Sequence, residues 1–185
     1  MAACLGENRE RLSPAEHLKM NEILLFTDGS VNTNSGIGCG AYLVVKNLDY
    51  INLESLKDSV KIKRFDSTSS TKLELETLLW ALNKVIPQLG KLNNELKIYT
   101  DSQNIIGLLG RRQVLEQNDY YSKNNKRLLN YQLYKKFYEM SDQLNFKLIK
   151  VKGHKALSQK NETDRYFTLV DQAARRAMKE NQTLK

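Results

Sequence analysis

Residues 23–30 read ILLFTDGS, and this stretch decides the fold of the chain. Its four leading apolar residues predict a short buried strand, and the four that follow, Thr27 to Ser30, predict a turn at the end of that strand. A second strand is expected from Gly36 to Val45, because an Asn-, Gly- and Ser-rich link of the kind found in hairpins separates the two apolar runs. Asp28 is thereby placed at the end of the first strand.

The rest of the chain alternates between strands and helices. A third strand is expected within Tyr50 to Phe65. The clearest helix runs from Ser69 to Ile86, where apolar residues recur at i, i+3, i+4 and i+7; Thr71 and Glu74 match a capping box at its start, and Pro87 is expected to end it. The remaining elements are a strand at Leu96–Thr100, a short helix to about Leu109, a helix at about Asn130–Asp142, a strand at Phe146–Val151 and a helix at about Leu169–Lys179. This order predicts an α/β fold: a mixed five-stranded sheet, made of an antiparallel meander plus parallel strands and flanked by helices.

Length and composition fit one globular domain. We expect residues 1–21 of the 185 to form an arm, disordered or loosely helical, and residues 22–182 to form the domain. The 41% apolar content and the two prolines exclude collagen-like and Pro-rich disordered chains.

The sequence also limits where the protein works. No run approaches the roughly 18 apolar residues of a membrane helix, and charged residues are scattered through residues 1–22, where a signal peptide would be apolar. We therefore expect an intracellular, cytoplasmic protein with no membrane partner. Cys4 and Cys39 cannot build a disulfide framework or a Cys-based zinc site, and Cys39 is expected to be a small core residue.

The net charge of +8 favours a polyanionic partner, and the alternative is a basic surface with no partner. The charge is concentrated between Ile105 and Lys136, where seven basic and two acidic residues give a local charge of 7 − 2 = +5.

Two aspartates each follow a predicted strand. In open α/β sheets functional groups gather at strand ends, so Asp28 and Asp101 would lie close together if their strands are neighbours. Carboxylates that close need a shared proton or a cation, and Mg²⁺ is the cation their oxygens favour. Glu74, in the first turn of the long helix, could join them. The structural alternatives are that the aspartates only form turns and that Glu74 only closes the capping box.

Five short motifs, in order along the chain, resemble the signatures of type 1 ribonuclease H. They are FTDGS at residues 26–30 with the glycine-rich run from Gly36, TKLEL at 71–75, YTDSQ at 99–103, VKGH at 151–154 and VDQAA at 170–174. The resemblance covers about residues 22–180. It implies a ribonuclease H-like fold and a Mg²⁺-dependent endonuclease that cuts the RNA strand of RNA/DNA hybrids, giving 5′-phosphate and 3′-hydroxyl products.

By this resemblance, four carboxylates would hold two Mg²⁺ ions, with Mn²⁺ as an alternative metal: Asp28, Glu74, Asp101 and Asp171. The ions would lower the pKa of the attacking water and stabilise the departing 3′ oxygen. His154 would be a further catalytic residue, as a proton shuttle or an aid to product release. Asp164 fits the family's usual spacing from His154 better than Asp171 does, but it lacks the Asp-x-Ala pattern, so Asp171 is preferred.

The resemblance also implies a surface that binds the hybrid. The contacts near the cleavage site would be Asn34, Ser70, Thr71 and Gln103. Two of them, Ser70 and Thr71, stand where the family often has asparagines. Residues 105–129 correspond to the family's basic protrusion, and its phosphate contacts would be Arg111, Arg112, Lys123, Lys126 and Arg127. That protrusion usually carries tryptophans, whereas the one Trp of this chain is Trp80, in the long helix.

Two other classes of function stay open on the sequence alone. One is a different nuclease of the same superfamily, directed at DNA or derived from a retroelement. The other is a non-catalytic nucleic-acid-binding module, which would be expected to have lost at least one acidic ligand. A monomer is the default expectation.

Overall fold

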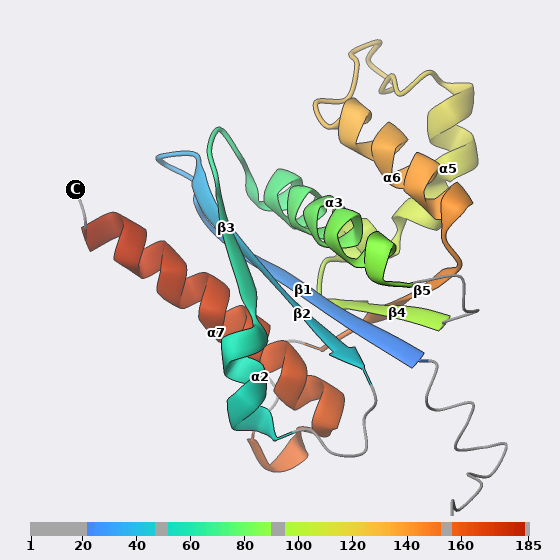
Figure 1. The fold of residues 1–185 in the computed structure, drawn as a ribbon. Coiled ribbons are helices and arrows are strands. Elements are labelled where there is room, and N and C mark those ends of the chain that lie inside the picture. Colours follow the sequence, from blue (N-terminus) through green and yellow to red (C-terminus); the bar gives the residue numbers. More distant parts are fainter. Residues whose placement is uncertain (1–21, 47–51, 90–94, 153–156, 184–185) are drawn as a thin grey trace, which may run out of the picture.

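The computed structural model describes residues 22–46, 52–89, 95–152 and 157–183 (Figure 1). Its centre is a sheet with the strand order β3-β2-β1-β4-β5. The strands are β1 (Glu22–Asn32), β2 (Ile37–Lys46), β3 (Lys61–Phe65), β4 (Glu95–Thr100) and β5 (Phe146–Lys150). β2 pairs antiparallel with β1 and β3, whereas β4 pairs parallel with β1 and β5. The predicted mixed five-stranded sheet is confirmed.

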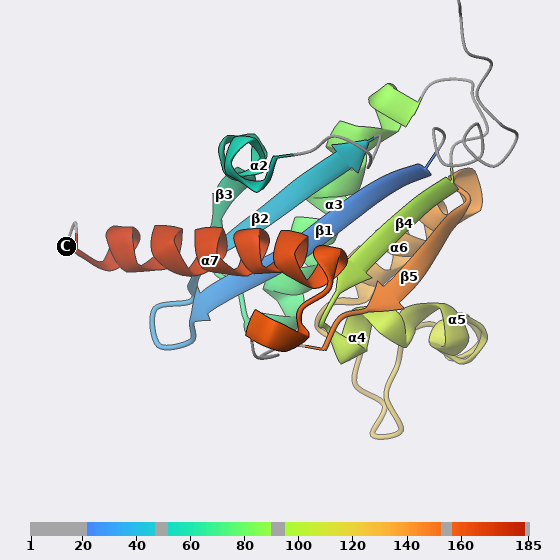
Figure 2. The ribbon, with the colours of Figure 1, turned by 90° about the horizontal axis from the view of Figure 1, so that it is seen from below.

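Helices cover both faces of this sheet. They are α2 (Leu53–Ser59), α3 (Ser70–Leu89), α4 (Gln103–Ile106), α5 (Leu108–Gln117), α6 (Tyr131–Gln143) and α7 (Glu162–Thr183), with a 3₁₀ turn at Leu157–Gln159. Figure 2 shows α7 lying across one face of the sheet, with α3 and α6 behind the other. α5 and the loop between α5 and α6 extend beyond the sheet (Figure 1).

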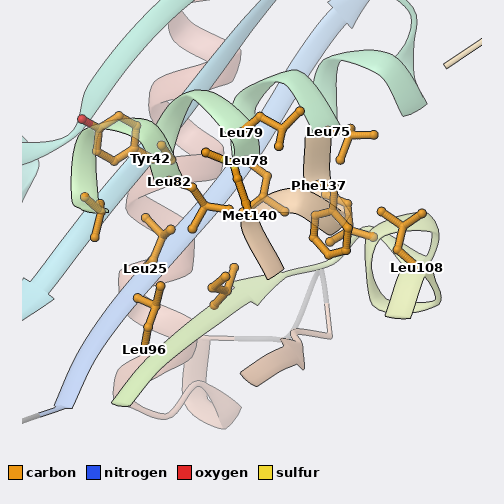
Figure 3. Packing of buried hydrophobic residues seen from close by; sticks show 14 of the residues in the cluster. Leu25, Tyr42, Leu75, Leu78, Leu79, Leu82, Leu96, Leu108, Phe137 and Met140 are labelled. Atoms are coloured by element: carbon orange, nitrogen blue, oxygen red, sulfur yellow. The ribbon is translucent and has the colours of Figure 1, made fainter. Parts of the chain in front are cut away.

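Alternation along β1 divides the core into two layers. Ile23 and Leu25 belong to a cluster under α3 and α6, while Leu24 and Phe26 belong to a cluster under α7. All four side chains are at most 4% exposed. Figure 3 shows the first cluster, in which leucines of α3 pack with Leu25. Burial on both faces explains why the sequence of this strand is an unbroken apolar run.

Glycines allow α3 to approach the sheet closely. A Cβ atom at Gly40 of β2 would lie 2.0 Å from Thr77 Oγ1, and one at Gly29 of β1 would lie 2.9 Å from the Leu73 side chain. The helix therefore packs directly on the strand backbone. This contact fixes the N-terminal half of α3 relative to β1.

β1 is longer than the sequence predicts. It runs to Asn32, because β2 pairs with it as far as Asn32↔Ile37, so Asp28 lies within the strand and not at its end. The parallel pairing with β4 stops earlier, at Phe26↔Tyr99. Continuing that register by two residues brings Asp28 level with Asp101, just beyond the end of β4.

The predicted start of the long helix at Ser69 lies within one residue of the observed start, but its predicted end is wrong. α3 continues through Pro87 to Leu89, because a proline near the end of a helix removes only one backbone hydrogen bond. The capping box does not form either. Thr71 lies inside the helix and its Oγ1 accepts a hydrogen bond from Asn104 Nδ2 (3.2 Å), and Glu74 is bonded to Ser102.

Two further helical segments lie where the sequence predicts other structure. α2 precedes β3 in the region where only a strand is expected, and Asn52 caps it by accepting a hydrogen bond from the Glu54 amide (3.0 Å). α5 extends to Gln117, beyond the predicted end at about Leu109. The sequence of α5 is mostly polar, and its apolar residues do not recur at the i, i+3, i+4 and i+7 spacing that marks α3.

α7 begins at Glu162, seven residues before the predicted start at Leu169. A reciprocal cap fixes this start: the Asp164 amide donates to Asn161 Oδ1 (2.8 Å), and the Asn161 amide donates to Asp164 Oδ2 (3.1 Å). The pair replaces the usual Ser/Thr and Glu of a capping box, so a search for the common pattern passes over it.

Cys39 is 1% exposed, which confirms the prediction of a small core residue. Among the described helices, none combines the length and apolarity needed to cross a membrane. The predicted arm at residues 1–21 lies outside the described residues.

Candidate active site

Four acidic side chains that are distant in the sequence line one pocket of about 360 Å³. They come from four elements: Asp28 from β1, Glu74 from α3, Asp101 from the residue after β4, and Asp171 from α7. Since α3 and α7 cover opposite faces of the sheet (Figure 2), the pocket draws carboxylates from both layers of the molecule. Arg175 is the one cation among the described residues that line it.

Burial and repulsion shape the electrostatics of this pocket. The pKa of Asp28 is raised to about 8, first by burial and then by the negative charge of Asp101, with Asp171 adding to the shift. Burial also raises the pKa of Glu74, while a hydrogen bond from Ser102 opposes that shift and the charge of Asp101 adds to it. Carboxylates this close are unfavourable unless they share a proton or a cation. The pocket therefore favours a bound proton or a bound cation.

Two of the four carboxylates are bonded to neighbouring side chains. Ser102 Oγ donates to Glu74, and Arg175 Nε donates to Asp171 Oδ1 at 2.6 Å. In the described part of the chain, no three His, Cys, Asp or Glu side chains are grouped so that they could hold a metal ion. The donor chemistry nevertheless fits Mg²⁺ or Mn²⁺, since all four groups supply hard carboxylate oxygens. Some side chains must shift before three of them can share one ion.

The structure places Asp171 in the pocket and Asp164 outside it. Asp164 is 6% exposed, and its carboxylate takes part in the cap at the start of α7. His154 lies outside the described residues. The catalytic and metal-binding roles of these residues stay predictions.

Comparison with known proteins assigns the chain to a family. The family model described as RNase H matches residues 20–179. The chain belongs to the RNase H family. The resemblance inferred from the five motifs is thus confirmed. No curated protein matches the chain significantly.

Solved foamy virus structures share the fold of this RNase H domain. The native protease–reverse transcriptase of prototype foamy virus matches with a TM-score of 0.65 and 16% identity, over 86% of this chain and 21% of that one. The solution structure of the PFV RNase H domain matches with a TM-score of 0.61 and 12% identity, over 85% and 93% of the two chains. A foamy viral protease–reverse transcriptase in complex with dsDNA matches with a TM-score of 0.57 and 11% identity, over 88% and 98%. The chain spans about a fifth of the first of these proteins.

In this RNase H domain, three consecutive residues after Asp101 hold the rim of the pocket together; residues 102–104 are termed the clip. Each uses its side chain to bind another element: Ser102 binds Glu74, Gln103 accepts from Lys150 Nζ (2.5 Å), and Asn104 donates to Thr71 (3.2 Å). The clip therefore ties the end of β4 to the start of α3 on one side and to β5 on the other.

The four residues predicted to touch the hybrid near the cleavage site fall into two pairs. Asn34, in the turn between β1 and β2, and Ser70, the first residue of α3, are exposed. Thr71 accepts a hydrogen bond from Asn104 of the clip, and Gln103, which belongs to the clip, accepts one from Lys150. Their contacts with nucleic acid stay predictions.

The predicted basic protrusion corresponds to α4, α5 and the loop that leads to α6. Its three arginines are bonded within the chain: Arg111 to the carbonyls of Gly107 and Asn104, Arg112 to Glu116 and Asp142, and Arg127 to Asp119. The Arg127 guanidinium also lies 5.1 Å and 4.6 Å from the ring centroids of Tyr121 and Tyr131. Lys123 and Lys126 are exposed, as are Arg111 and Arg127.

Sequence reasoning missed four residues at the pocket and its rim: Ser102, Asn104, Lys150 and Arg175. Arg175 follows Asp171 by four residues on one helix, a spacing that marks an ion pair and could have identified it. The partners of Ser102 and Asn104 are 28 and 33 residues away. No local pattern marks contacts of that range.

Proposed function

We propose that this RNase H domain is an endonuclease that hydrolyses the RNA strand of RNA/DNA hybrids in the presence of Mg²⁺, leaving 5′-phosphate and 3′-hydroxyl ends. The observation that carries the proposal is the convergence of four carboxylates on one pocket in a chain of this family. Such a pocket can act on a phosphodiester without a protein nucleophile.

The proposed metal-binding residues are Asp28, Glu74, Asp101 and Asp171. Two divalent ions bound there would supply activation of the attacking water and stabilisation of the leaving 3′ oxygen. The chain itself orients the carboxylates: Ser102 holds Glu74, and the clip holds α3 against the end of β4. Asp101 is exposed, so a nucleic-acid strand can reach it. We propose His154 as the group that moves a proton at the leaving side.

Substrate binding is proposed to rest on the basic surface. The exposed ammonium groups of Lys123 and Lys126 are available for phosphates of the DNA strand, and the hydroxyl groups of Ser70 and Thr71 can bond phosphate or sugar oxygens. A hydroxyl-bearing pair beside Glu74 would help to distinguish RNA by its 2′-hydroxyl.

The foamy virus matches favour a second candidate, an RNase H domain of a retroelement polyprotein. The reaction would be the same. It would differ in needing other domains for substrate binding, so the chain alone would then cleave hybrids only at high protein concentration.

The test is incubation of the chain with matched RNA/DNA, RNA/RNA and DNA/DNA duplexes, with and without Mg²⁺. We expect only the RNA/DNA hybrid to be cut, and only with the metal. Asp101→Asn should abolish cleavage but keep hybrid binding, whereas Asp58→Asn, an exposed change on α2, should alter neither. Cleavage of DNA/DNA would support a DNA-directed nuclease, and binding without any cleavage would support a binding module.

A further inference from the structure

We infer that Arg175 is an internal counter-ion for Asp171, and that Asp171 must be released from Arg175 when the pocket takes up a divalent cation. This makes Arg175 a positioning residue, since it acts through Asp171. The inference rests on the proposed function, because it concerns the same pocket.

The geometry of the pair supports release. Arg175 and Asp171 lie one turn apart on α7, with Arg175 Nε 2.6 Å from Asp171 Oδ1, and both line the pocket. The Arg175 side chain is 54% exposed and the Asp171 side chain 28%. The guanidinium can therefore turn into solvent without moving the helix, while the more buried carboxylate stays directed at the pocket.

The charges explain why the pair forms. Asp171 adds to the repulsion felt by Asp28, and Arg175 is the one cation among the described lining residues. A guanidinium bonded to Asp171 offsets part of this negative charge. The same bond opposes a divalent cation in two ways: it occupies an oxygen that the cation would use, and it keeps a positive charge beside the cation.

The bond between Arg175 and Asp171 also explains how the carboxylates of the pocket are arranged. The donors are of the right chemistry and line one pocket, yet no three of them among the described residues are grouped to hold an ion. Asp171 is bonded to Arg175 and Glu74 to Ser102, so two of the four carboxylates have a protein donor on one of their oxygens while they still line the pocket. Arg175 is the partner that carries a charge, so its removal should alter cation affinity most.

The experiment is calorimetric titration of Mg²⁺ into the full, metal-free chain without nucleic acid, for the wild type, R175Q and R175K. Arg176 supplies the matched control: R176Q makes the same charge change on the next residue, which is exposed and lines a different pocket beside α2. We expect R175Q to bind Mg²⁺ about fivefold more tightly than the wild type, R175K to fall between them, and R176Q to match the wild type.

Unchanged binding by R175Q would overturn the inference, because Arg175 would then not compete with the cation for Asp171. Weaker binding would overturn it too, because Arg175 would then hold Asp171 in a ligating position. Should R175Q fold poorly by circular dichroism, R175M keeps the aliphatic stem and gives the same comparison. A wild type that binds no Mg²⁺ and cuts no hybrid would sink the proposed function itself. A wild type that binds and cuts, with no gain in R175Q, would sink only the role of Arg175.

Discussion

The acidic pocket and the basic protrusion use charge in opposite ways. In the pocket, four carboxylates stand beside a single arginine, and the pKa of Asp28 is raised to about 8. In the protrusion, Arg112 and Arg127 are paired with carboxylates: Arg112 binds Glu116 and Asp142 and lies over the ring of Tyr138, and Arg127 binds Asp119. Ionising the carboxylates of the pocket therefore destabilises the fold, whereas the ion pairs of Arg112 and Arg127 stabilise it. A count of charges in the sequence does not distinguish these two cases.

The contrast bears on which cations meet the substrate. An arginine that is already bonded to carboxylates gains less from a phosphate, because it must first give up its partners. Exposed lysines have no such bond to lose. We therefore expect the lysines of the protrusion to contribute more to nucleic-acid binding than its arginines.

The largest effect is expected from Asp28→Asn in the pocket. Hybrid cleavage should fall by about a hundredfold or more, because a proposed ligand to the ions is lost. The same substitution should increase the stability of the metal-free chain at neutral pH. The folded-state pKa of about 8 lies above the ordinary 3.8, so the folded state holds the proton more tightly, and the free energy of unfolding of the metal-free wild type falls as pH rises from about 4 to 8.

Asp28→Asn removes this dependence and should raise the free energy of unfolding at pH 7 by about 1 to 3 kcal/mol. Urea unfolding from pH 4 to 8 in a metal chelator measures it, with Asp58→Asn as the control. A variant that is less stable than the wild type at pH 7 would show that repulsion does not govern the pocket.

The next effect sharpens the division within the protrusion. The double variant Lys123→Gln/Lys126→Gln should weaken hybrid binding and reduce the slope of log affinity against log salt by about two, since each lysine accounts for about one phosphate. Its thermal unfolding should match that of the wild type. Fluorescence anisotropy over a range of salt concentrations tests this, and an unchanged slope would exclude these lysines as phosphate contacts.

Arg112→Gln should give the reverse pattern. The bond to Asp142 joins α5 to α6, and the bond to Glu116 lies within α5. Their loss should lower the midpoint of thermal unfolding, while the salt slope of hybrid binding changes by less than in the lysine double variant. Calorimetric scans and the same anisotropy titrations measure the two quantities. A larger change in salt slope than in unfolding would mean that Arg112 grips the substrate.

The smallest effect is expected at the clip. Asn104→Ala removes the hydrogen bond to Thr71 and should slow hybrid cleavage by about fivefold, the loss that corresponds to about 1 kcal/mol for one hydrogen bond. Single-turnover rates measure the change, with Asn118→Ala, at the far end of α5, as the control. Equal rates for wild type and Asn104→Ala would mean that the clip does not position α3 for catalysis.

The success and failure of the sequence predictions have physical causes. The central strand β1 could be predicted because burial on both faces gives an unbroken apolar run, and α3 because burial of one face gives an apolar period. The parallel and antiparallel pairings follow from connection lengths. α5 could not, since it projects from the sheet and little of it is buried. The start of α7 was hidden because an Asn–Asp pair forms its cap.

The sequence alone determined the family, the succession of strands and helices along the chain, and the acidic residues proposed as metal ligands, because short motifs and apolar periods are local properties of a chain. The tertiary structure decided which groups those residues contact: Asp28 lies level with Asp101, Glu74 is bonded to Ser102, and Asp171 is bonded to Arg175. It also decided that Asp171 lines the pocket, whereas Asp164 caps α7. Most of these contacts join residues that are far apart in the chain. Their energies depend on distance and burial, which only the folded arrangement of strands and helices sets.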